Sequence, residues 1–462
     1  MTLIKSISGF RGTIGGRPGD TLSPIDAVKF AAAYGGWLKE RFPDQLVYKV
    51  VVGRDARLSG EMIQGLVMNT LIAMGIDVLD LGLSTTPTVE VMVPHEKAQG
   101  GIILTASHNP KEWNALKLLN EKGEFINAEE GKALLALADA GTMEFSEVEK
   151  LGKISVLEDA IEEHIEMILA HPLVDAEAIA RKGFKVAVDA VNSTGGIAIP
   201  KLLKALGVER VEELYCEPTG HFPHNPEPLE EHLTDIMETV KRTSSDLGIV
   251  VDPDVDRLAL IDEKGRMFGE EYTLVAVADY VLENKRGGVV SNLSSSRALR
   301  DLAERKGGHY EASAVGEVNV VSKMKEINAV IGGEGNGGII VPDLHYGRDA
   351  LIGVALILTH LAKSEKTLSE LKEGYPEYHM AKMKAQLDPS TDVDAILEKI
   401  KEGVTEGTVN TIDGVKIDLK DRWVHMRKSN TEPIIRIYTE APTAEAAKEL
   451  GEEYVSRILS LM

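Results

Sequence analysis

One pattern of alternating elements occurs three times in the chain and limits the folds open to it. An apolar strand leads into a polar loop, an amphipathic helix and a second strand, over residues 50–82, 185–214 and 288–316. A glycine, which commonly ends a helix, separates each helix from the strand after it: Gly75, Gly207 and Gly307. Alternating strands and helices predict parallel sheets covered by helices, in which loops after the carboxyl ends of the strands carry ligands.

The last part of the chain follows a different order. Residues 408–419, 423–427 and 433–441 read as strands, and residues 441–462 as one terminal helix. We therefore predict an α/β protein with three consecutive α/β domains, their mixed sheets mainly parallel, and a smaller C-terminal α+β domain. The predicted domains are residues 1–151, 152–262, 263–375 and 376–462.

Charge and cysteine content restrict the partners of the chain. The 462 residues carry a net charge of −22, which argues against nucleic acid or an anionic membrane as a partner. The single cysteine, Cys216, cannot form an internal disulfide, and no apolar signal segment or run of about 18 uncharged apolar residues is present. We expect a cytoplasmic monomer or homodimer that binds a small molecule.

A serine-containing hexapeptide, Thr105-Ala-Ser-His-Asn-Pro110, follows an apolar run that reads as a strand. A strand ending there would place the Ser107 hydroxyl on a loop that faces a ligand. The residues alone also allow a simpler interpretation, in which the serine and the asparagine only shape a turn before the proline.

Three carboxylates at alternate positions, Asp252, Asp254 and Asp256, follow the apolar run at 246–251. Such a set can converge on one hard cation, and without a cation the carboxylates would repel one another. An EF-hand loop is excluded, because Arg257 stands where that loop needs glycine and a strand follows. An aspartate-nucleophile phosphatase of the haloacid-dehalogenase type stays open as an alternative, with Asp254-Val-Asp256 as its motif.

Two further loops carry polar groups. Residues 333–338 match a dinucleotide-binding glycine pattern, but a strand follows where a helix would be required, and no Walker A motif exists. A simpler interpretation of Glu334 is an acid on a surface turn. The second loop combines hydroxyl, amide and guanidinium groups suited to a phosphate, namely Arg427, Ser429, Asn430, Thr431 and Arg436.

These four segments, in this order, resemble the α-D-phosphohexomutase superfamily over nearly the whole chain. The resemblance implies that Ser107 is phosphorylated, that the three aspartates hold Mg²⁺ against its phosphate, and that Glu334 and Asn336 contact sugar hydroxyls. It further implies that residues 427–436 grip the phosphate that is not transferred. Residues expected to assist the transfer are Lys117 as general acid or base, His108 in the serine motif, and Arg11 and Arg257 near the phosphoserine. Each of the two arginines could equally be a surface cation.

The chain departs from the superfamily at several positions. Pro253 and Val255 replace the usual glycines of the metal loop and stiffen it, and Asn336 replaces the commoner serine. Gly338 stands where a histidine often follows the sugar loop, so no role of that histidine transfers to this chain.

The implied activity moves a phosphate between the 1- and 6-hydroxyls of a hexose through a 1,6-bisphosphate, with a hexose 1,6-bisphosphate as activator. Residues 314–324 and 337–350, with the serine and cradle motifs, look most like archaeal-type phosphoglucosamine mutases, which interconvert glucosamine 6-phosphate and glucosamine 1-phosphate. Phosphoglucomutase or phosphomannomutase activity is the alternative. A binding protein without catalysis would be marked by loss of Ser107, a metal aspartate or Arg427, and all are present.

Overall fold

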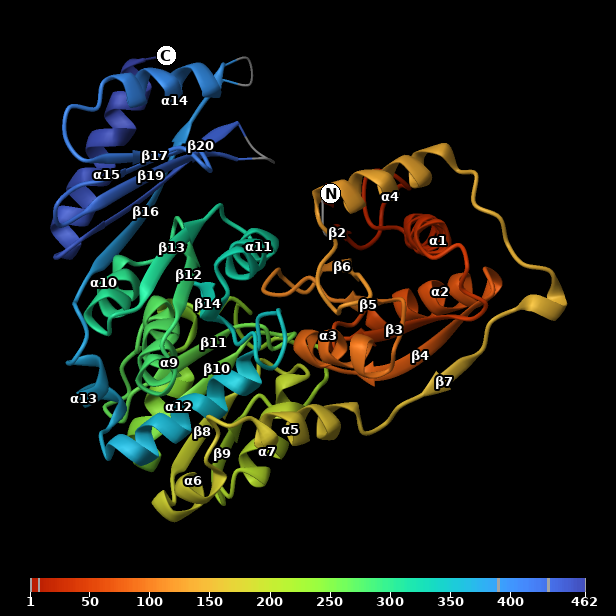
Figure 1. Cartoon of the computed structure of the whole chain (residues 1–462), viewed down its shortest axis with the longest axis horizontal. Helices are drawn as coiled ribbons and strands as arrows, with labels where there is room; N and C mark the ends of the chain where they lie inside the picture. The colour runs from red at the N-terminus through yellow and green to blue at the C-terminus, as the bar shows by residue number, and fades with distance from the viewer. Residues whose placement is uncertain (1, 7–8, 389–390, 430–432, 462) are drawn as a thin grey trace. The chain divides into compact units, whose positions relative to one another are not determined.

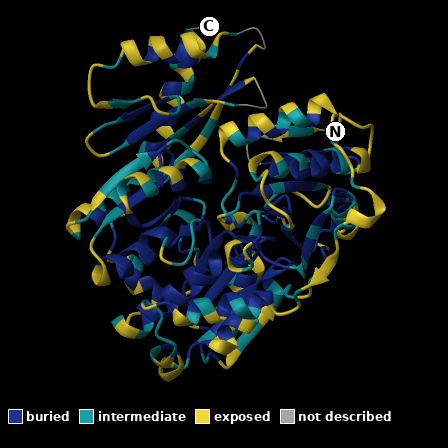
Figure 2. Cartoon of the chain, turned by 45° about the vertical axis from the view of Figure 1, so that its right-hand side comes forward, coloured by how far each residue is buried: buried dark blue, intermediate teal, exposed yellow. Residues whose placement is uncertain are grey.

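A computed structural model of the chain describes residues 2–6, 9–388, 391–429 and 433–461 (Figure 1). The chain forms two compact units, Met1–Thr273 with Asn336–Leu371, and Leu274–Gly335 with Lys372–Met462. In both units the strands are largely buried, and exposed residues lie mainly on helices and loops (Figure 2). Among the described residues, no helix has the length and apolar composition needed to cross a membrane.

A seven-stranded sheet with the order β1-β2-β6-β5-β3-β4-β7 begins the first unit. The strands are β1 Leu3–Ser6, β2 Gly9–Thr13, β3 Tyr48–Arg54, β4 Ile76–Leu83, β5 Gly100–Leu104, β6 Trp113–Leu119 and β7 Ile154–Val156. Its helices are α1 Pro24–Arg41, α2 Gly60–Ala73, α3 Thr86–His95 and α4 Ala128–Ala140. Alternate residues of β3 point to opposite faces, so Val50 and Val52 join the core with α1, α2 and α4, whereas Val51 joins the core with α3.

The second sheet of the first unit has the order β11-β10-β8-β9. Its strands are β8 Lys185–Asp189, β9 Arg210–Leu214, β10 Leu247–Val251 and β11 Leu258–Ile261, of which only the β10–β11 pair is antiparallel. The unit also contains the helical elements η1 Val148–Lys150, α5 Ala160–Ala170, α6 Ala176–Lys182, α7 Gly195–Ala205, η2 Glu230–His232, α8 Thr234–Thr243 and α12 Ala350–Ser364, and strand β15 Gly338–Ile340. The turn between β10 and β11 is the predicted metal loop.

The chain enters the second unit within α9 Glu270–Asn284. Three strands of this unit pair in parallel in the order β13-β12-β14: β12 Gly288–Asn292, β13 His309–Ser313 and β14 Ala329–Glu334. The helices that connect them are α10 Arg297–Arg305 and α11 Glu317–Ile327, and α13 Leu368–Lys372 lies at the return of the chain to this unit.

The C-terminal sheet is antiparallel throughout, with the order β16-β20-β19-β18-β17. Its strands are β16 His379–Gln386, β17 Thr408–Asn410, β18 Val415–Asp418, β19 Trp423–Lys428 and β20 Ile434–Ala441. Helices α14 Val393–Glu402 and α15 Ala444–Ser460 pack on the same core cluster, drawn in blue in Figure 1. Helices confined to one face of an antiparallel sheet are typical of an α+β domain.

The predicted fold class is confirmed. Each of the three repeats forms two parallel strands joined by a helix, and all three predicted glycines have a left-handed backbone, with φ of +73° at Gly75, +78° at Gly207 and +72° at Gly307. The sequence analysis missed β16 and α14. Their charged composition, as in HMAKMKAQ for β16, hides the apolar alternation that marks a strand.

Substitution by alanine should have opposite effects on stability at Gly65 and at Gly307. Gly65 lies inside α2 and Gly307 has a φ of +72°, and an added Cβ at either position meets no atom within 4 Å. Gly65→Ala should stabilise its unit by about 0.5–1 kcal/mol, whereas Gly307→Ala should destabilise its unit by about 1–2 kcal/mol. Thermal unfolding of each variant measures the two shifts, and shifts of the same sign would contradict the assignment of the Gly307 backbone.

Candidate active site

The ends of two strands bring the serine motif and the aspartates together. Strand β5 ends at Leu104 and delivers Ser107, and strand β10 ends at Val251 and delivers the three aspartates. Both segments lie at carboxyl ends of strands, where α/β sheets bind ligands. The Ser107 hydroxyl donates a hydrogen bond of 2.8 Å to Asp252 Oδ2, although 145 positions separate the two residues.

The backbone at Ser107 has a left-handed conformation, with φ of +48°. Its N–H donates to Thr105 Oγ1 at 2.9 Å, and the Thr105 hydroxyl in turn donates to Asp55 Oδ2 at 2.7 Å. A left-handed conformation costs free energy in a residue with a side chain and persists only where its surroundings fix it. These hydrogen bonds fix the turn, so the serine is held in one position.

Arg57 is the main support of this loop, and the sequence analysis missed it. Its guanidinium is buried and paired with Asp55 Oδ2 at 2.9 Å. The same group donates to four backbone carbonyls of the serine loop, those of Ser107, Asn109, Pro110 and Trp113. A planar group with five donors suits this arrangement, which a lysine with a single nitrogen cannot reproduce.

Asp252, Asp254 and Asp256 form a buried carboxylate cluster. All three are fully buried, and one oxygen of each lies within 4.8 Å of the others. Burial, reinforced by the two neighbouring carboxylates, raises the pKa of Asp252 well above its ordinary value. Asp254 Oδ1 and Asp256 Oδ1 are buried and have no hydrogen-bond partner among the described residues. Buried carboxylate oxygens that accept no hydrogen bond are suitable ligands for a hard divalent cation such as Mg²⁺.

Three side chains supply positive charge to this cluster, and the most distant is Arg257, whose Nε lies 3.9 Å from Asp256 Oδ1. Lys117 Nζ lies 2.7 Å from Asp254 Oδ2 and 3.3 Å from Asp256 Oδ2, and Arg348 Nη2 donates to Asp256 Oδ2 at 2.7 Å. Burial lowers the pKa of Lys117, but the two carboxylates outweigh burial, and the net pKa is raised. Lys117 is therefore an ammonium ion in this arrangement. Arg348 is a second residue that the sequence analysis missed.

The metal loop is held by hydrogen bonds to its backbone and side chains. Thr86, at the start of α3, donates to Asp254 twice, from its hydroxyl to Oδ2 at 2.5 Å and from its N–H to the carbonyl at 2.8 Å. The hydroxyls of Ser193 and Thr194 both donate to the Pro253 carbonyl. Val255 has a φ of +64°, which is rare for a β-branched residue and which glycine adopts without strain.

The other predicted residues of this region surround the serine. Arg11 Nη1 donates to Asn109 Oδ1 at 2.9 Å, and the Arg257 N–H donates to Asp252 Oδ1 at 3.2 Å. His108 Nδ1 lies 3.4 Å from Ser107 Oγ. Burial, reinforced by Arg257, lowers the pKa of His108 to about 2, so its imidazole is neutral at ordinary pH.

The predicted sugar loop is divided between the units. Glu334 belongs to the second unit, where its buried Oε1 accepts hydrogen bonds from Asn292 Nδ2 at 2.8 Å and from the Gly316 N–H at 3.1 Å. It is not an acid on a surface turn. Asn336 belongs to the first unit, and its Oδ1 accepts from the Gly338 N–H at 3.2 Å.

The predicted phosphate cradle lies on two paired strands of the second unit. Arg427 on β19 is directly opposite Arg436 on β20, which is in turn opposite Lys384 on β16. Directly opposite residues share a face of the sheet, so three cationic side chains lie in one row. Asp413 offsets part of this charge, with its Oδ2 3.4 Å from Arg427 Nε. The Ser429 N–H donates a hydrogen bond to the Ile434 carbonyl at 3.1 Å. Asn430 and Thr431 lie outside the described residues.

Four family models match the chain in succession. Phosphoglucomutase/phosphomannomutase alpha/beta/alpha domains I, II and III match residues 4–144, 162–265 and 269–378, and the C-terminal domain of the same family matches residues 380–456. The domain limits given in the sequence analysis stay predictions.

Whole-chain relatives agree with the family models. A phosphoglucomutase/phosphomannomutase of Thermococcus kodakarensis is 39% identical over 96% of both chains. A phosphoglucosamine/phosphogalactosamine mutase of Sulfurisphaera tokodaii is 33% identical over 94% of both.

Solved structures share the fold. A phosphoglucomutase/phosphomannomutase family protein of Burkholderia thailandensis superimposes with a TM-score of 0.84 at 26% identity, over 99% of this chain and 98% of that one. An Aspergillus fumigatus N-acetylphosphoglucosamine mutase, solved with GlcNAc-6P and magnesium, has a TM-score of 0.57 at 13% identity, over 94% and 99% of the chains, and shows the fold alone. The chain thus belongs to the phosphoglucomutase/phosphomannomutase family and is a phosphohexomutase.

Proposed function

We propose that the protein interconverts glucosamine 6-phosphate and glucosamine 1-phosphate through a phosphoserine at Ser107 and a sugar 1,6-bisphosphate. The observation that supports this most is the 2.8 Å hydrogen bond between Ser107 Oγ and Asp252 Oδ2. It sets a hydroxyl against three buried carboxylates that fit Mg²⁺, on which the family depends. Phosphoryl transfer requires positioning and neutralisation of charge above all else.

The proposed transfer breaks the bond from phosphorus to Ser107 Oγ and forms a bond from phosphorus to a sugar hydroxyl oxygen. The aspartates would hold Mg²⁺, which when bound offsets negative charge on the seryl oxygen. The displaced seryl oxygen takes up a proton, and the sugar hydroxyl loses one. In the second half, the bisphosphate returns its other phosphate to Ser107, so the enzyme is regenerated. A trace of hexose 1,6-bisphosphate would activate unphosphorylated enzyme by the same transfer, without ATP.

Lys117 is the proposed group that exchanges a proton with the sugar hydroxyl. Its ammonium is bound to Asp254 and Asp256, which keeps it protonated. A metal cation bound to those carboxylates would compete with Lys117 for the same oxygens. It would therefore lower the pKa of Lys117 from its raised value. Lys117 would then be able to release its proton and to accept one from the substrate. Removing a general acid or base typically costs about 10²–10⁴-fold in rate.

The proposed substrate anchors come from two loops of the chain. Glu334 and Asn336 would contact sugar hydroxyls, and Arg427, Ser429, Asn430, Thr431 and Arg436 would bind the phosphate that is not transferred. The position of Lys384 in the same cationic row as the two arginines supports an anion site and adds a residue to it. His108, Arg11 and Arg257 would orient the serine loop and its phosphate. A cytoplasmic location and a monomeric or homodimeric state also stay predictions.

The choice of sugar is supported by the archaeal-type motifs and by the Sulfurisphaera tokodaii relative named for glucosamine and galactosamine phosphates. A second candidate, mutase activity on glucose and mannose phosphates, is favoured by the Thermococcus kodakarensis relative at 39% identity.

A reversible mutase assay with Mg²⁺ and a trace of glucose 1,6-bisphosphate separates the two candidates. We expect kcat/KM for glucosamine 6-phosphate to be at least about tenfold higher than for glucose 6-phosphate or mannose 6-phosphate. A tenfold ratio corresponds to a difference of about 1.4 kcal/mol in activation free energy. A preference for either neutral sugar would replace the proposal with the second candidate. Release of free sugar and phosphate in place of isomerisation would refute both.

Replacing Arg57 should slow turnover without removing any group that touches substrate. Arg57→Lys keeps the charge but loses most of the bonds to the serine-loop carbonyls, so Ser107 should shift. We expect kcat to fall about 100-fold, the effect of a misplacement of about 1 Å. Arg41→Lys is the matched control, because Arg41 is paired with Glu121 and Glu130 on the surface of α1 and should leave kcat unchanged. Equal kcat values in the two variants would exclude a positioning role for Arg57.

A further inference from the structure

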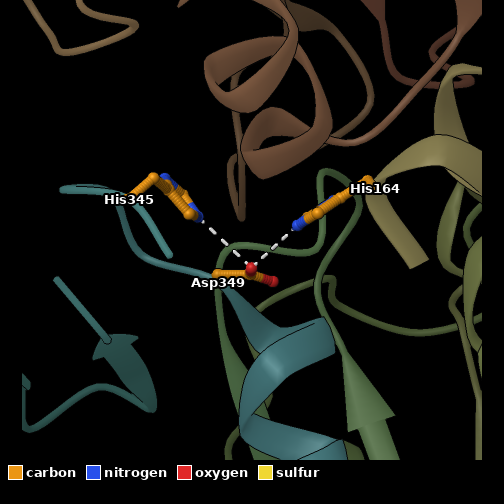
Figure 3. A group of neighbouring side chains, drawn as sticks. All are labelled: His164, His345 and Asp349. Carbon is orange, nitrogen blue, oxygen red and sulfur yellow. Dashed lines mark hydrogen bonds and ion pairs between the residues drawn. The ribbon is translucent and has the colours of Figure 1, made fainter. Parts of the chain in front are cut away.

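A second group of metal-type ligands lies in the first unit, apart from the three aspartates. His164 on α5, His345 before α12 and Asp349 at the start of α12 converge on one point (Figure 3). Asp349 Oδ2 lies 3.1 Å from His164 Nε2 and 3.2 Å from His345 Nε2. We propose that these three side chains bind a divalent transition-metal ion of the Zn²⁺ type.

The distances fit a small tetrahedral ion. With metal–ligand bonds of about 2.0–2.1 Å, neighbouring ligands of tetrahedral zinc are about 3.3–3.4 Å apart. The two measured distances are close to that value. Both imidazoles direct Nε2 to the same carboxylate oxygen, while Asp349 Oδ1 accepts hydrogen bonds from the N–H groups of Leu351 and Ile352 (Figure 3). The helix therefore fixes one carboxylate oxygen and leaves the other for the metal.

The outer nitrogen of each imidazole faces a partner on α3. His164 Nδ1 lies 3.1 Å from Thr88 Oγ1, and His345 Nδ1 lies 3.5 Å from Glu90 Oε2. Histidines that bind metals through one nitrogen usually donate the N–H of the other to such an oxygen, which orients the ring. Thr88 is such a partner for His164, whereas Glu90 lies beside His345 Nδ1, which makes no hydrogen bond to any described residue.

Charge and burial favour a cation here. The side chains of His164 and Asp349 are completely buried, and those of His345 and Glu90 are 9% and 1% exposed. Asp349 and Glu90 place two carboxylates beside the imidazoles, and a mixed set of carboxylate and imidazole ligands favours a divalent cation. Imidazole nitrogen selects zinc-like ions, whereas the all-carboxylate cluster at residues 252–256 suits Mg²⁺.

The proposed ion would join segments that fall in three family models. His164 lies in the domain II match, His345 and Asp349 in the domain III match, and their outer partners Thr88 and Glu90 in the domain I match. Two neighbours of the cluster reach the magnesium loop directly: Thr86 binds Asp254 and Arg348 binds Asp256. The ion would be structural, fixing both contacts without touching substrate.

Cobalt binding to the full chain tests the site. Metal-stripped protein in excess Mg²⁺, which occupies the all-carboxylate cluster, is titrated with Co²⁺ while its visible absorption is followed. We expect one equivalent to bind with the intense bands of four-coordinate cobalt, and added Zn²⁺ to displace it and raise the thermal unfolding temperature. His164→Gln and His345→Gln should lose the bands, whereas His360→Gln, a buried histidine further along α12, should keep them.

Two milder variants probe the outer partners. Thr88→Val and Glu90→Gln should weaken Co²⁺ binding about 10- to 100-fold without abolishing it. Should the histidine variants fail to fold, X-ray absorption of the Zn²⁺-loaded wild-type protein must still report two imidazole ligands. The proposal is overturned if wild-type protein takes up no Co²⁺ or Zn²⁺ in excess Mg²⁺, if bound zinc lacks imidazole ligands, or if folded histidine variants bind like wild type. In that case His164, His345 and Asp349 would only form hydrogen bonds with one another and would bind no metal.

Discussion

The repulsion among three buried carboxylates is the constraint around which the first unit is arranged. Asp252, Asp254 and Asp256 are fully buried on one tight turn, and burying unpaired charge is among the costliest things a fold can do. The structure offsets it with the ammonium of Lys117, the guanidinium of Arg348 and a raised pKa at Asp252. Under the proposed function each of these groups would also serve phosphate transfer, because each holds positive charge or a proton beside Ser107 or the aspartates.

The same region combines two strained turns. Ser107 and Val255 both have left-handed backbones, at +48° and +64°, and neither is glycine. Such strain survives only where surrounding contacts over-determine the conformation, and it is common at functional sites. Arg57 supplies those contacts for the serine loop, and Thr86, Ser193 and Thr194 supply them for the metal loop. These contacts therefore fix the positions of Ser107 and of the loop that carries the three aspartates.

The sequence predicted the parts of this structure that depend on local pattern. The three repeats, their terminal glycines and the strand ends that carry Ser107 and the aspartates follow from hydrophobic period and turn chemistry. Arg57, Arg348 and Thr86 could not be found in this way, because a single arginine or threonine gains its role from partners about 50 to 170 positions away. Lys384 and the cluster of His164, His345 and Asp349 were missed for the same reason.

A labelling experiment tests most directly whether phosphate passes through Ser107. The enzyme is incubated with Mg²⁺ and glucose 1,6-bisphosphate that is radiolabelled in its phosphate groups. The labelled peptide is identified before and after a chase with unlabelled hexose 6-phosphate. We expect an acid-stable phosphoester on Ser107 that the chase converts to sugar bisphosphate, and no label in Ser107→Ala. Label on Asp254 or Asp256, with the alkali lability of an acyl phosphate, would contradict it.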